Sequence, residues 1–313
     1  MKNQTWTSEN IPNQKGKVVI VTGSSSGIGY EAARVLANKQ ATVIIAVRNL
    51  DKGNKALEKI LRQNKDAKVK VMELDLTNLV SVKSFAEAFK KNYSHLDLLI
   101  NNAGVMIPPY SKTTDGFELQ FGTNHLGHFA LTGQLLEILI NTKGARIVNV
   151  SSSAHKWGNI SFEDLTWEKR KYAPWKAYSD SKIANLYFTN ELNKKLKENN
   201  LDTLTTAAHP GWTATELQRN TGIVEFLNGF LAMDITKGAL PTLRAATQAD
   251  LKGGEFFGPN GLFEIWGYPI EVQPNKLSKD ENIANKLWRI SEELTGVKFK
   301  FNKRMDKSLY AST

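Results

Sequence analysis

KVVIVTGSSSGIG, residues 17–29, is the stretch that decides the fold of this chain. Residues 17–22 are β-branched or apolar apart from the leading lysine, which is typical of a buried strand. Residues 27–39 follow with Ile28, Ala32 and Val35 at helical spacing, so we expect a helix with one apolar face. The turn between them consists of glycine and serine alone. A strand, a tight turn and a helix in this order predict one unit of a parallel α/β sheet.

The same alternation continues through the first two thirds of the chain. We expect further strands at residues 42–47, 68–74, 96–100, 145–150 and 203–208. Further helices are expected at residues 51–63, 78–90, 114–140 and 176–199. Apolar strands separated by helices imply that both faces of the sheet are covered. The sequence therefore predicts an α/β fold of the Rossmann type, a doubly wound parallel sheet with helices on both faces in a single domain.

The predicted domain spans residues 16–297. Residues 1–15 are expected to form an N-terminal extension, and residues 298–313 a basic C-terminal tail. Two stretches interrupt the alternation: residues 155–175, rich in aromatic and charged side chains, and the glycine-rich turns at residues 253–261. We interpret the first as an insertion and the second as loops around the same domain.

Composition limits the classes of protein to consider. With 41% hydrophobic and 23% charged residues, the chain of 313 residues has the usage of an ordinary globular protein. It contains no cysteine, which excludes disulfides, thiolate metal sites and a cysteine nucleophile and suits a reducing compartment. Because no apolar run is long enough for a signal peptide or a membrane span, we expect a cytoplasmic protein without a membrane span. No metal site is expected.

The net charge of +10 suggests a polyanionic partner, but its distribution argues against one. Lysines such as Lys52, Lys55 and Lys59 occur singly, with acidic residues such as Asp51 and Glu58 among them. Such a pattern is typical of a solvated surface, so no nucleic-acid partner is predicted. The densest basic stretch, residues 298–307, is interpreted as a disordered end, with a weak anionic contact as the alternative.

The turn at residues 23–29 suits a diphosphate. A phosphate group that approaches the backbone closely needs residues without a Cβ, and a helix N-terminus offers unpaired N–H groups and partial positive charge. The glycine spacing is looser than Gly-x-Gly-x-x-Gly, so the alternative is that these glycines only form a tight turn. The strand before the turn and the helix after it favour a dinucleotide site.

Thr-Gly-x-x-x-Gly-x-Gly, beginning at Thr22, resembles the short-chain dehydrogenase/reductase family. Four further motifs agree with that resemblance and follow in the family's order: Asp75-Leu76, Asn101-Asn102-Ala103-Gly104, Tyr178-x-x-x-Lys182 and His209-Pro210-Gly211-Trp212-Thr213-Ala214-Thr215. By resemblance, the cofactor-binding residues are Gly23, Ser25, Ser26, Gly27, Ile28, Gly29, Arg48, Asn49, Asp75, Leu76, Asn102, Ala103, Gly104, Tyr178, Lys182, Pro210, Gly211, Thr213 and Thr215.

The end of the second strand indicates which dinucleotide is bound. NAD enzymes place an acidic residue there to bond the adenosine ribose, whereas this chain has Val47-Arg48-Asn49. A guanidinium at Arg48 can pair with a 2′-phosphate through charge-assisted bonds, so NADP(H) is favoured over NAD(H). The alternative is that Arg48 is an ordinary exposed residue, since Ser26 lacks the second basic group of some NADP enzymes of the family.

Tyr178 and Lys182 lie one helical turn apart and therefore share one helix face. A phenol titrates near pH ~10, so a tyrosine transfers protons at neutral pH only if a nearby cation stabilises its phenolate. Lys182 is placed to do this. By resemblance, Lys182 also holds the nicotinamide ribose.

Three serines, residues 151–153, follow the fifth predicted strand at the sheet edge where ligands bind in such folds. Ser152 corresponds best to the family's catalytic serine, which bonds the substrate carbonyl oxygen, and Ser151 and Ser153 are the alternatives. Asn124 matches the fourth catalytic member of the family, which orders a water linked to the lysine. The alternative for Asn124 is a buried amide that only satisfies helix backbone.

The chain departs from the common pattern between Ser152 and Tyr178, which are 26 positions apart, against about half that in most family members. The extra aromatic residues resemble the insertion of the retinol dehydrogenase-like branch: Trp157, Phe162, Trp167, Tyr172 and Trp175. They either wall an apolar substrate cleft or pack the insertion onto the domain. The C-terminal part resembles soluble bacterial members of that branch.

These observations predict an NADP(H)-dependent oxidoreductase that interconverts a carbonyl and an alcohol, with an apolar aldehyde, ketone or retinoid-like substrate. Reduction of a protochlorophyllide-like substrate is disfavoured, because those members of the branch rely on cysteines and this chain has none. The alternative from another class is a catalytically idle NADP-binding redox sensor or scaffold. The sequence leaves the oligomeric state open between a monomer and a homodimer.

Overall fold

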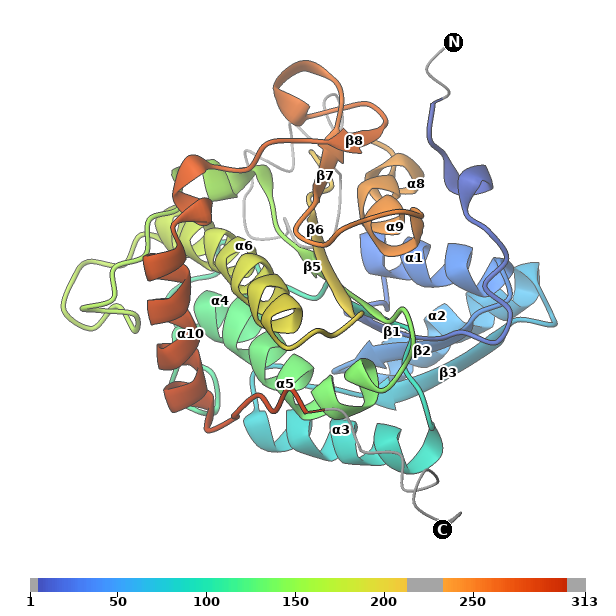
Figure 1. Ribbon diagram of the computed structural model, residues 1–313, viewed down its shortest axis with the longest axis horizontal. Helices are drawn as coiled ribbons and strands as arrows, with labels where there is room; N and C mark the ends of the chain where they lie inside the picture. The colour runs from blue at the N-terminus through green and yellow to red at the C-terminus, as the bar shows by residue number, and fades with distance from the viewer. Residues whose placement is uncertain (1–4, 213–232, 303–313) are drawn as a thin grey trace.

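The chain forms one α/β domain around a single sheet (Figure 1). The computed structural model describes residues 5–212 and 233–302. Within these residues the sheet has eight strands in the order β3-β2-β1-β4-β5-β6-β7-β8, all parallel except β8, which runs antiparallel to β7. The strands are β1 (Val18–Thr22), β2 (Thr42–Val47), β3 (Lys68–Glu73), β4 (Leu98–Asn101), β5 (Arg146–Val150), β6 (Leu204–Ala208), β7 (Phe256–Pro259) and β8 (Pro269–Glu271). The predicted fold is confirmed.

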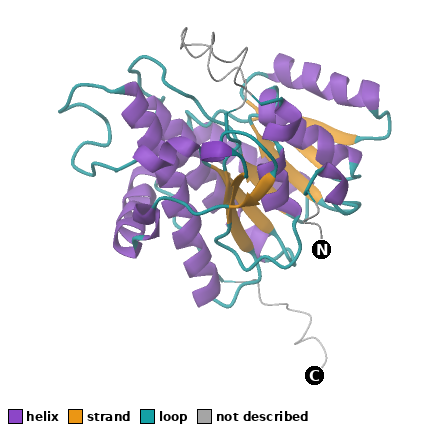
Figure 2. Cartoon of the chain, turned by 90° about the horizontal axis from the view of Figure 1, so that it is seen from above, coloured by secondary structure: helices purple, strands orange, loops and turns teal. Residues whose placement is uncertain are grey.

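Helices cover both faces of this sheet (Figure 2). One face carries α1 (Gly27–Asn38), α2 (Leu50–Gln63), α8 (Ile235–Gly238) and α9 (Leu240–Thr247). The other face carries α3 (Leu79–Asn92), α5 (Gly127–Ile140) and α6 (Pro174–Glu198), with α10 (Glu281–Thr295) packed against α6. The short helices are η1 (Ser8–Asn10), α4 (Leu119–Phe121), η2 (Gly122–Leu126), η3 (Ser153–Trp157), η5 (Leu262–Glu264) and η6 (Lys276–Lys279).

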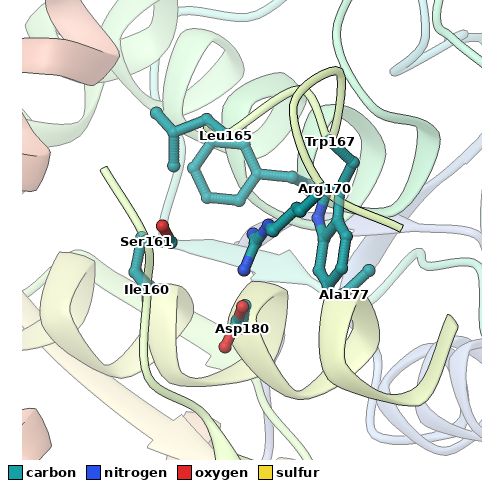
Figure 3. A pocket seen from close by; sticks show the side chains of 8 residues that line it. Ile160, Ser161, Leu165, Trp167, Arg170, Ala177 and Asp180 are labelled. Atoms are coloured by element: carbon teal, nitrogen blue, oxygen red, sulfur yellow. The ribbon is translucent and has the colours of Figure 1, made fainter. Parts of the chain in front are cut away.

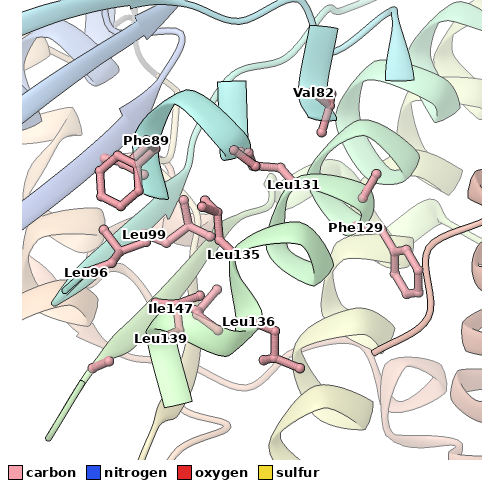
Figure 4. Close-up of a cluster of buried hydrophobic side chains, with 14 of the residues drawn as sticks. Val82, Phe89, Leu96, Leu99, Phe129, Leu131, Leu135, Leu136, Leu139 and Ile147 are labelled. Carbon is pink, nitrogen blue, oxygen red and sulfur yellow. The ribbon is translucent and has the colours of Figure 1, made fainter. Parts of the chain in front are cut away.

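Within the described residues the two larger hydrophobic cores lie one on each face of the sheet. In β1, Val18 and Ile20 face one core while Val19 and Val21 face the other. Figure 4 shows the first core, to which α3 contributes Phe89 and α5 contributes Leu135. Because both faces of the central strands are buried, these strands are continuous apolar runs in the sequence. The side chains that remain available for function therefore lie at the strand ends.

The predicted helix at residues 114–140 is corrected in two respects. It begins only at Leu119, and its first part contains a π-helical turn, η2, at residues 122–126. In η2 the Gly127 N–H donates to the Gly122 carbonyl, so one extra residue is accommodated in the turn. Hydrophobic periodicity does not reveal a single extra residue. Such turns are frequent at functional sites.

The interpretation of residues 253–261 as loops is wrong for residues 256–259, which form β7. Phe256 and Phe257 are buried and pair with Ala207 and Ala208 of β6, and β8 pairs with the other edge of β7. Two apolar residues in a glycine-rich stretch are too few to show the hydrophobic alternation of a strand. Only the pairing with β6 identifies β7.

The predicted C-terminal tail is also corrected, because its first residues pack against the domain. The Phe299 ring lies 4.8 Å from that of Phe129 and 4.5 Å from that of Trp288, measured between centroids. Lysines and phenylalanines alternate at residues 298–301, and the rings turn toward the core while Lys298 and Lys300 stay exposed. Interpretation as a disordered end is therefore wrong for residues 298–302. Residues 303–313 lie outside the described part of the chain.

Part of the predicted N-terminal extension is packed as well. Ile11 is buried in the core beneath α1, and Trp6 packs against the same core. The Gln14 N–H donates to the Lys39 carbonyl at 2.7 Å, which ties the extension to the end of α1. Among residues 5–212 and 233–302, no helix has both the length and the apolar character that a membrane crossing requires.

Candidate active site

The strand order reverses at β1, which has β2 on one side and β4 on the other. Loops that leave such a point on opposite sides open a crevice at the carboxyl edge of the sheet. Here the loops after β1 and β4 touch each other: a Cβ on Gly23 would lie 2.8 Å from Ala103 Cα, and one on Gly29 would lie 2.4 Å from Asn102 Nδ2. Glycine at these two positions therefore allows the two predicted cofactor loops to pack together.

Hydrogen bonds fix these two loops to one another. The Thr22 hydroxyl accepts the backbone N–H groups of Asn102 and Ala103, both at 2.9 Å. Asn102 Nδ2 donates to the Thr22 carbonyl at 2.8 Å. The side chain of Asn102, predicted to bind cofactor, is thus used to hold the loop. Sequence reasoning assigned no role to Thr22.

The N-terminus of α1 lacks a side-chain cap. Ser26 occupies the N-cap position without a capping bond, whereas Asn49, Asn78 and Asp280 cap α2, α3 and α10. Among the described residues, the first-turn N–H groups of α1 therefore have no side-chain acceptor, as an anion-binding helix end requires. Ser25, Ser26, Gly27 and Ile28 are all partly exposed there.

The residues predicted for the adenosine end of the cofactor differ in how they are placed. Arg48 is exposed directly after β2. Asn49 accepts the Lys52 N–H at 2.9 Å and caps α2. Asp75 uses one carboxylate oxygen, Oδ1, to accept the N–H and hydroxyl of Thr77, and the Leu76 side chain is buried. The capping role of Asn49 had a sequence signal, since asparagine is a preferred N-cap residue.

Tyr178 and Lys182 lie on α6 against the carboxyl end of β5. Lys182 Nζ is 5.6 Å from the centroid of the Tyr178 ring and donates to the Val150 carbonyl at 3.3 Å. Only 3% of Lys182 is exposed, and no acidic side chain of the described residues pairs with it. Burial lowers the pKa of Lys182 to about 8. A buried ammonium without a counter-ion is costly, and such groups concentrate at functional sites.

The three serines after β5 have different partners. Ser151 is buried, and its hydroxyl donates to the Lys182 carbonyl at 2.8 Å. Ser152 is partly exposed; its hydroxyl accepts the Ala154 N–H at 3.2 Å, and its side chain lies next to that of Tyr178. Burial raises the pKa of Tyr178 to about 12, and the neighbouring Ser152 side chain opposes the rise. Ser153 begins η3. Of the three serines, Ser152 is the one that the structure brings to Tyr178.

Asn124 lies in η2 and is fully buried. Its Nδ2 donates to the Val105 carbonyl at 3.0 Å and to the Ser181 hydroxyl at 2.9 Å, and its Oδ1 accepts the Val105 N–H at 2.8 Å. The side chain is thus committed to neighbouring protein groups, although it lies beside the site. Ser181 was not predicted; its signal is its position within Tyr-x-x-x-Lys.

Gly104 joins these groups to the cofactor loops. A Cβ at Gly104 would lie 3.1 Å from Asn124 Oδ1 and 3.6 Å from Lys182 Nζ. The loop after β4, the turn η2 and helix α6 therefore converge at one place. The structure brings Tyr178, Lys182, Ser152 and Asn124 together although they come from distant parts of the sequence.

The segment after β6 lies at the same edge. Gly211 has a φ of 68°, and a Cβ there would lie 2.4 Å from the Ile265 carbonyl oxygen. Pro210 precedes it and is partly exposed. Thr213 and Thr215, also predicted to bind cofactor, lie outside the described residues.

The insertion at residues 155–175 packs mainly onto the body of the domain. Trp167 is only 7% exposed, and the Arg170 guanidinium lies 3.5 Å from the centroid of its ring. Figure 3 shows Arg170 pointing from the insertion toward Asp180 on α6, across a small cavity. By contrast, Trp157 is 71% exposed and Trp175 is 50% exposed. Contact with the domain comes from Ile160, which is buried in a cluster with Phe121 and Ile183, whereas the two exposed indoles remain open to solvent.

The family model described as short chain dehydrogenase matches residues 17–223. The chain belongs to the short-chain dehydrogenase family. Retinol dehydrogenase 12 of Mus musculus is 41% identical over 298 residues, which cover 94% of this chain and 90% of that protein. Short-chain dehydrogenase TIC 32 B, chloroplastic, of Brassica napus is 37% identical over 305 residues, 92% of each chain. A crystal structure of an uncharacterized protein from Mycobacterium paratuberculosis is 43% identical, with a TM-score of 0.81 over 95% of this chain and 99% of that one.

This short-chain dehydrogenase is retinol dehydrogenase-like and is an oxidoreductase of carbonyl and alcohol groups. The family binds a nicotinamide nucleotide, and three features of the site fit one. The uncapped end of α1 suits the diphosphate, and the absent Cβ of Gly104 leaves the crevice open toward Lys182. Lys182 brings a charge that has no acidic partner within the described part of the chain. The family and the fold predicted from the sequence are both confirmed.

Proposed function

We propose that the chain is an NADP(H)-dependent oxidoreductase that interconverts an apolar aldehyde or ketone and the corresponding alcohol, with Tyr178 as the proton-transferring residue. The observation that carries this proposal is the meeting of Tyr178, Ser152 and Lys182 at the edge of the crevice beside Gly104. A proton donor, a hydrogen-bond donor and a fixed cation at one place suit chemistry in which a carbonyl oxygen gains negative charge.

In the reductive direction, the bound nicotinamide supplies a hydride to the carbonyl carbon. Tyr178 donates its phenolic proton to the carbonyl oxygen, and Ser152 holds that oxygen by a hydrogen bond. The Lys182 ammonium, 5.6 Å from the centroid of the Tyr178 ring, stabilises the phenolate that remains. In the oxidative direction the same groups act in reverse. Asn124 keeps Val105 and Ser181 in place around Lys182 and orders a water linked to it.

The proposed cofactor contacts follow the elements of the crevice. The diphosphate meets the backbone at the start of α1, formed by Gly23, Ser25, Ser26, Gly27, Ile28 and Gly29. The adenosine end meets Arg48, Asn49, Asp75 and Leu76. The nicotinamide end meets Asn102, Ala103, Gly104, Tyr178, Lys182, Pro210 and Gly211, with Thr213 and Thr215 after them in the chain.

Arg48 is proposed to select NADP(H) through its 2′-phosphate. Arg48→Glu removes a charge-assisted contact, for which we expect about a 10- to 100-fold rise in the NADPH dissociation constant and a smaller change for NADH. The measurement is nucleotide binding followed by fluorescence. Arg62→Glu, at the other end of α2, makes the same change of charge as a control. Equal losses in both variants, or tighter binding of NADH than of NADPH by the unaltered protein, would contradict the assignment.

The apolar substrate class is supported by relatives named retinol dehydrogenases. The direct test is a panel of retinoid, long-chain and aromatic aldehydes and ketones, set against short polar carbonyl compounds of matched reactivity. We expect saturable oxidation of NADPH, with kcat/KM at least about 10-fold higher for apolar members, since each buried methylene contributes about 0.8 kcal/mol. Binding of NADPH without turnover of any carbonyl compound would instead indicate an idle NADP-binding protein.

A further inference from the structure

His128 lies beneath the crevice, where it joins two parts of the candidate active site. It lies four residues after Asn124, near the start of α5, and is 2% exposed. Its Nε2 is 2.9 Å from the Thr22 hydroxyl, and its Nδ1 is 3.0 Å from the Asn124 carbonyl oxygen. Both ring nitrogens of one buried histidine are therefore engaged, one by the end of β1 and the other by η2.

The partners of Thr22 determine which nitrogen carries the proton. A hydroxyl has one hydrogen and two lone pairs, and the Thr22 hydroxyl already accepts the N–H groups of Asn102 and Ala103. Its hydrogen has two acceptors in reach, His128 Nε2 at 2.9 Å and the Ile100 carbonyl at 3.4 Å, and the shorter contact is the better bond. Nε2 is then the acceptor, so the proton sits on Nδ1 and is donated to the Asn124 carbonyl.

The surroundings keep this ring uncharged. Burial is the main cause that lowers the pKa of His128 to about 4; the bond to the Asn124 carbonyl opposes it, and the nearby Lys182 ammonium lowers the pKa further. A second proton, on Nε2, would face the Thr22 hydroxyl and place two cations close together. His128 thus acts as a fixed neutral connector, with a defined donor on one side and a defined acceptor on the other.

We propose that His128 is a positioning residue that couples the two cofactor loops to the turn that supports Lys182. Through Thr22 it fixes the backbone of Asn102 and Ala103, and through the Asn124 carbonyl it fixes η2 beside Gly104 and Lys182. The inference rests on the proposed function for its kinetic consequence. Its consequence for nucleotide binding depends only on the family's cofactor site.

Two variants separate the two halves of this connection. His128→Asn places an amide near the Nδ1 position and keeps the donor to the Asn124 carbonyl, but it is too short to reach Thr22. His128→Gln reaches the Nε2 position and keeps an acceptor for the Thr22 hydroxyl, but it loses the donor to the Asn124 carbonyl. His125→Gln is the matched control, because His125 is equally buried in η2 but contacts Ser291 of α10.

The readouts are the dissociation constant of the nicotinamide nucleotide that the unaltered chain binds more tightly, kcat at saturating nucleotide, and the thermal midpoint. We expect His128→Asn to raise the dissociation constant about 5- to 20-fold, the effect of one lost buried hydrogen bond. His128→Gln is expected to change binding less than about 3-fold and to lower kcat about 5- to 20-fold. His125→Gln should lower the thermal midpoint and leave both constants unchanged.

A merely structural role for His128 predicts a different result. All three variants would then lower the thermal midpoint alike, and nucleotide binding per folded molecule would stay within about 2-fold of the unaltered chain. That outcome, or a loss of binding in His125→Gln equal to that in His128→Asn, would overturn the proposal. If the unaltered chain turned over no carbonyl compound, the proposed function would fail, and the binding measurement would still decide the role of His128.

Discussion

Replacement of Tyr178 by phenylalanine is expected to lower kcat for carbonyl reduction about 1,000-fold, within the range that a positioned general acid contributes. The substitution removes one oxygen from a side chain that is 5% exposed. The ring continues to fill its place, so the dissociation constant for NADPH should change less than about 3-fold. The measurements are the rate of carbonyl reduction, at steady state and in a single turnover, and the dissociation constant for NADPH, determined by fluorescence.

Tyr187→Phe is the matched control for this prediction. Tyr187 lies on the same helix, is 1% exposed and belongs to a separate hydrophobic cluster. Loss of its hydroxyl should leave kcat within about 2-fold of the unaltered chain, as expected away from the reacting atoms. Turnover that is equal in the two variants would remove Tyr178 from proton transfer.

Replacement of Lys182 by methionine is expected to lower kcat about 100-fold. A cation within ~4–6 Å of an acidic group lowers its pKa by ~1–3 units, so loss of the ammonium should raise the pKa of the Tyr178 phenol and slow proton transfer by a similar factor. Methionine has similar length and fills the same buried space. Lys194→Met, on the exposed side of α6, is the control and should retain full activity.

The ionisation of Lys182 is expected to limit kcat at high pH. Burial lowers the pKa of Lys182 from its usual value to about 8, so the ammonium is present below that pH and is lost as the pH rises through it. Carbonyl reduction needs a protonated Tyr178 and a charged Lys182, so kcat should be level between pH ~6 and ~7 and fall above pH ~8. Lys182→Met should lack this decline. If the decline persisted in the variant, another group would be responsible for it.

The features that could be predicted from the sequence are those whose residues are close together along the chain. The run at residues 17–29 predicts β1, its turn and α1, because strand, glycines and helix are contiguous. Tyr178 and Lys182 are one turn apart on any helix, so their common face follows from spacing alone. The confirmed fold and family rest on such segments.

Other features depend on distant parts of the chain and left no local signal. Ser151, Ser152 and Ser153 are identical in type, and only the contact of Ser151 with Lys182 and of Ser152 with Tyr178 separates them. The sequence left the aromatic insertion undecided between a cleft wall and packing, because the cluster that holds Ile160 includes residues of α6 that are distant in the sequence. β7 and the packed tail were missed for the same physical reason.

The position of Phe299 has a consequence for how the chain folds during synthesis. Its ring completes a cluster with Phe129, Phe188 and Trp288, whose other members are made earlier on the ribosome. Until the ring arrives, the aromatic surface between α5 and α6 stays open, so that face of the sheet closes last. The cofactor loops, built from β1 and β4, can form well before then. The nascent chain can therefore pair the two cofactor loops early, and it is most exposed to aggregation late in translation, before Phe299 is added.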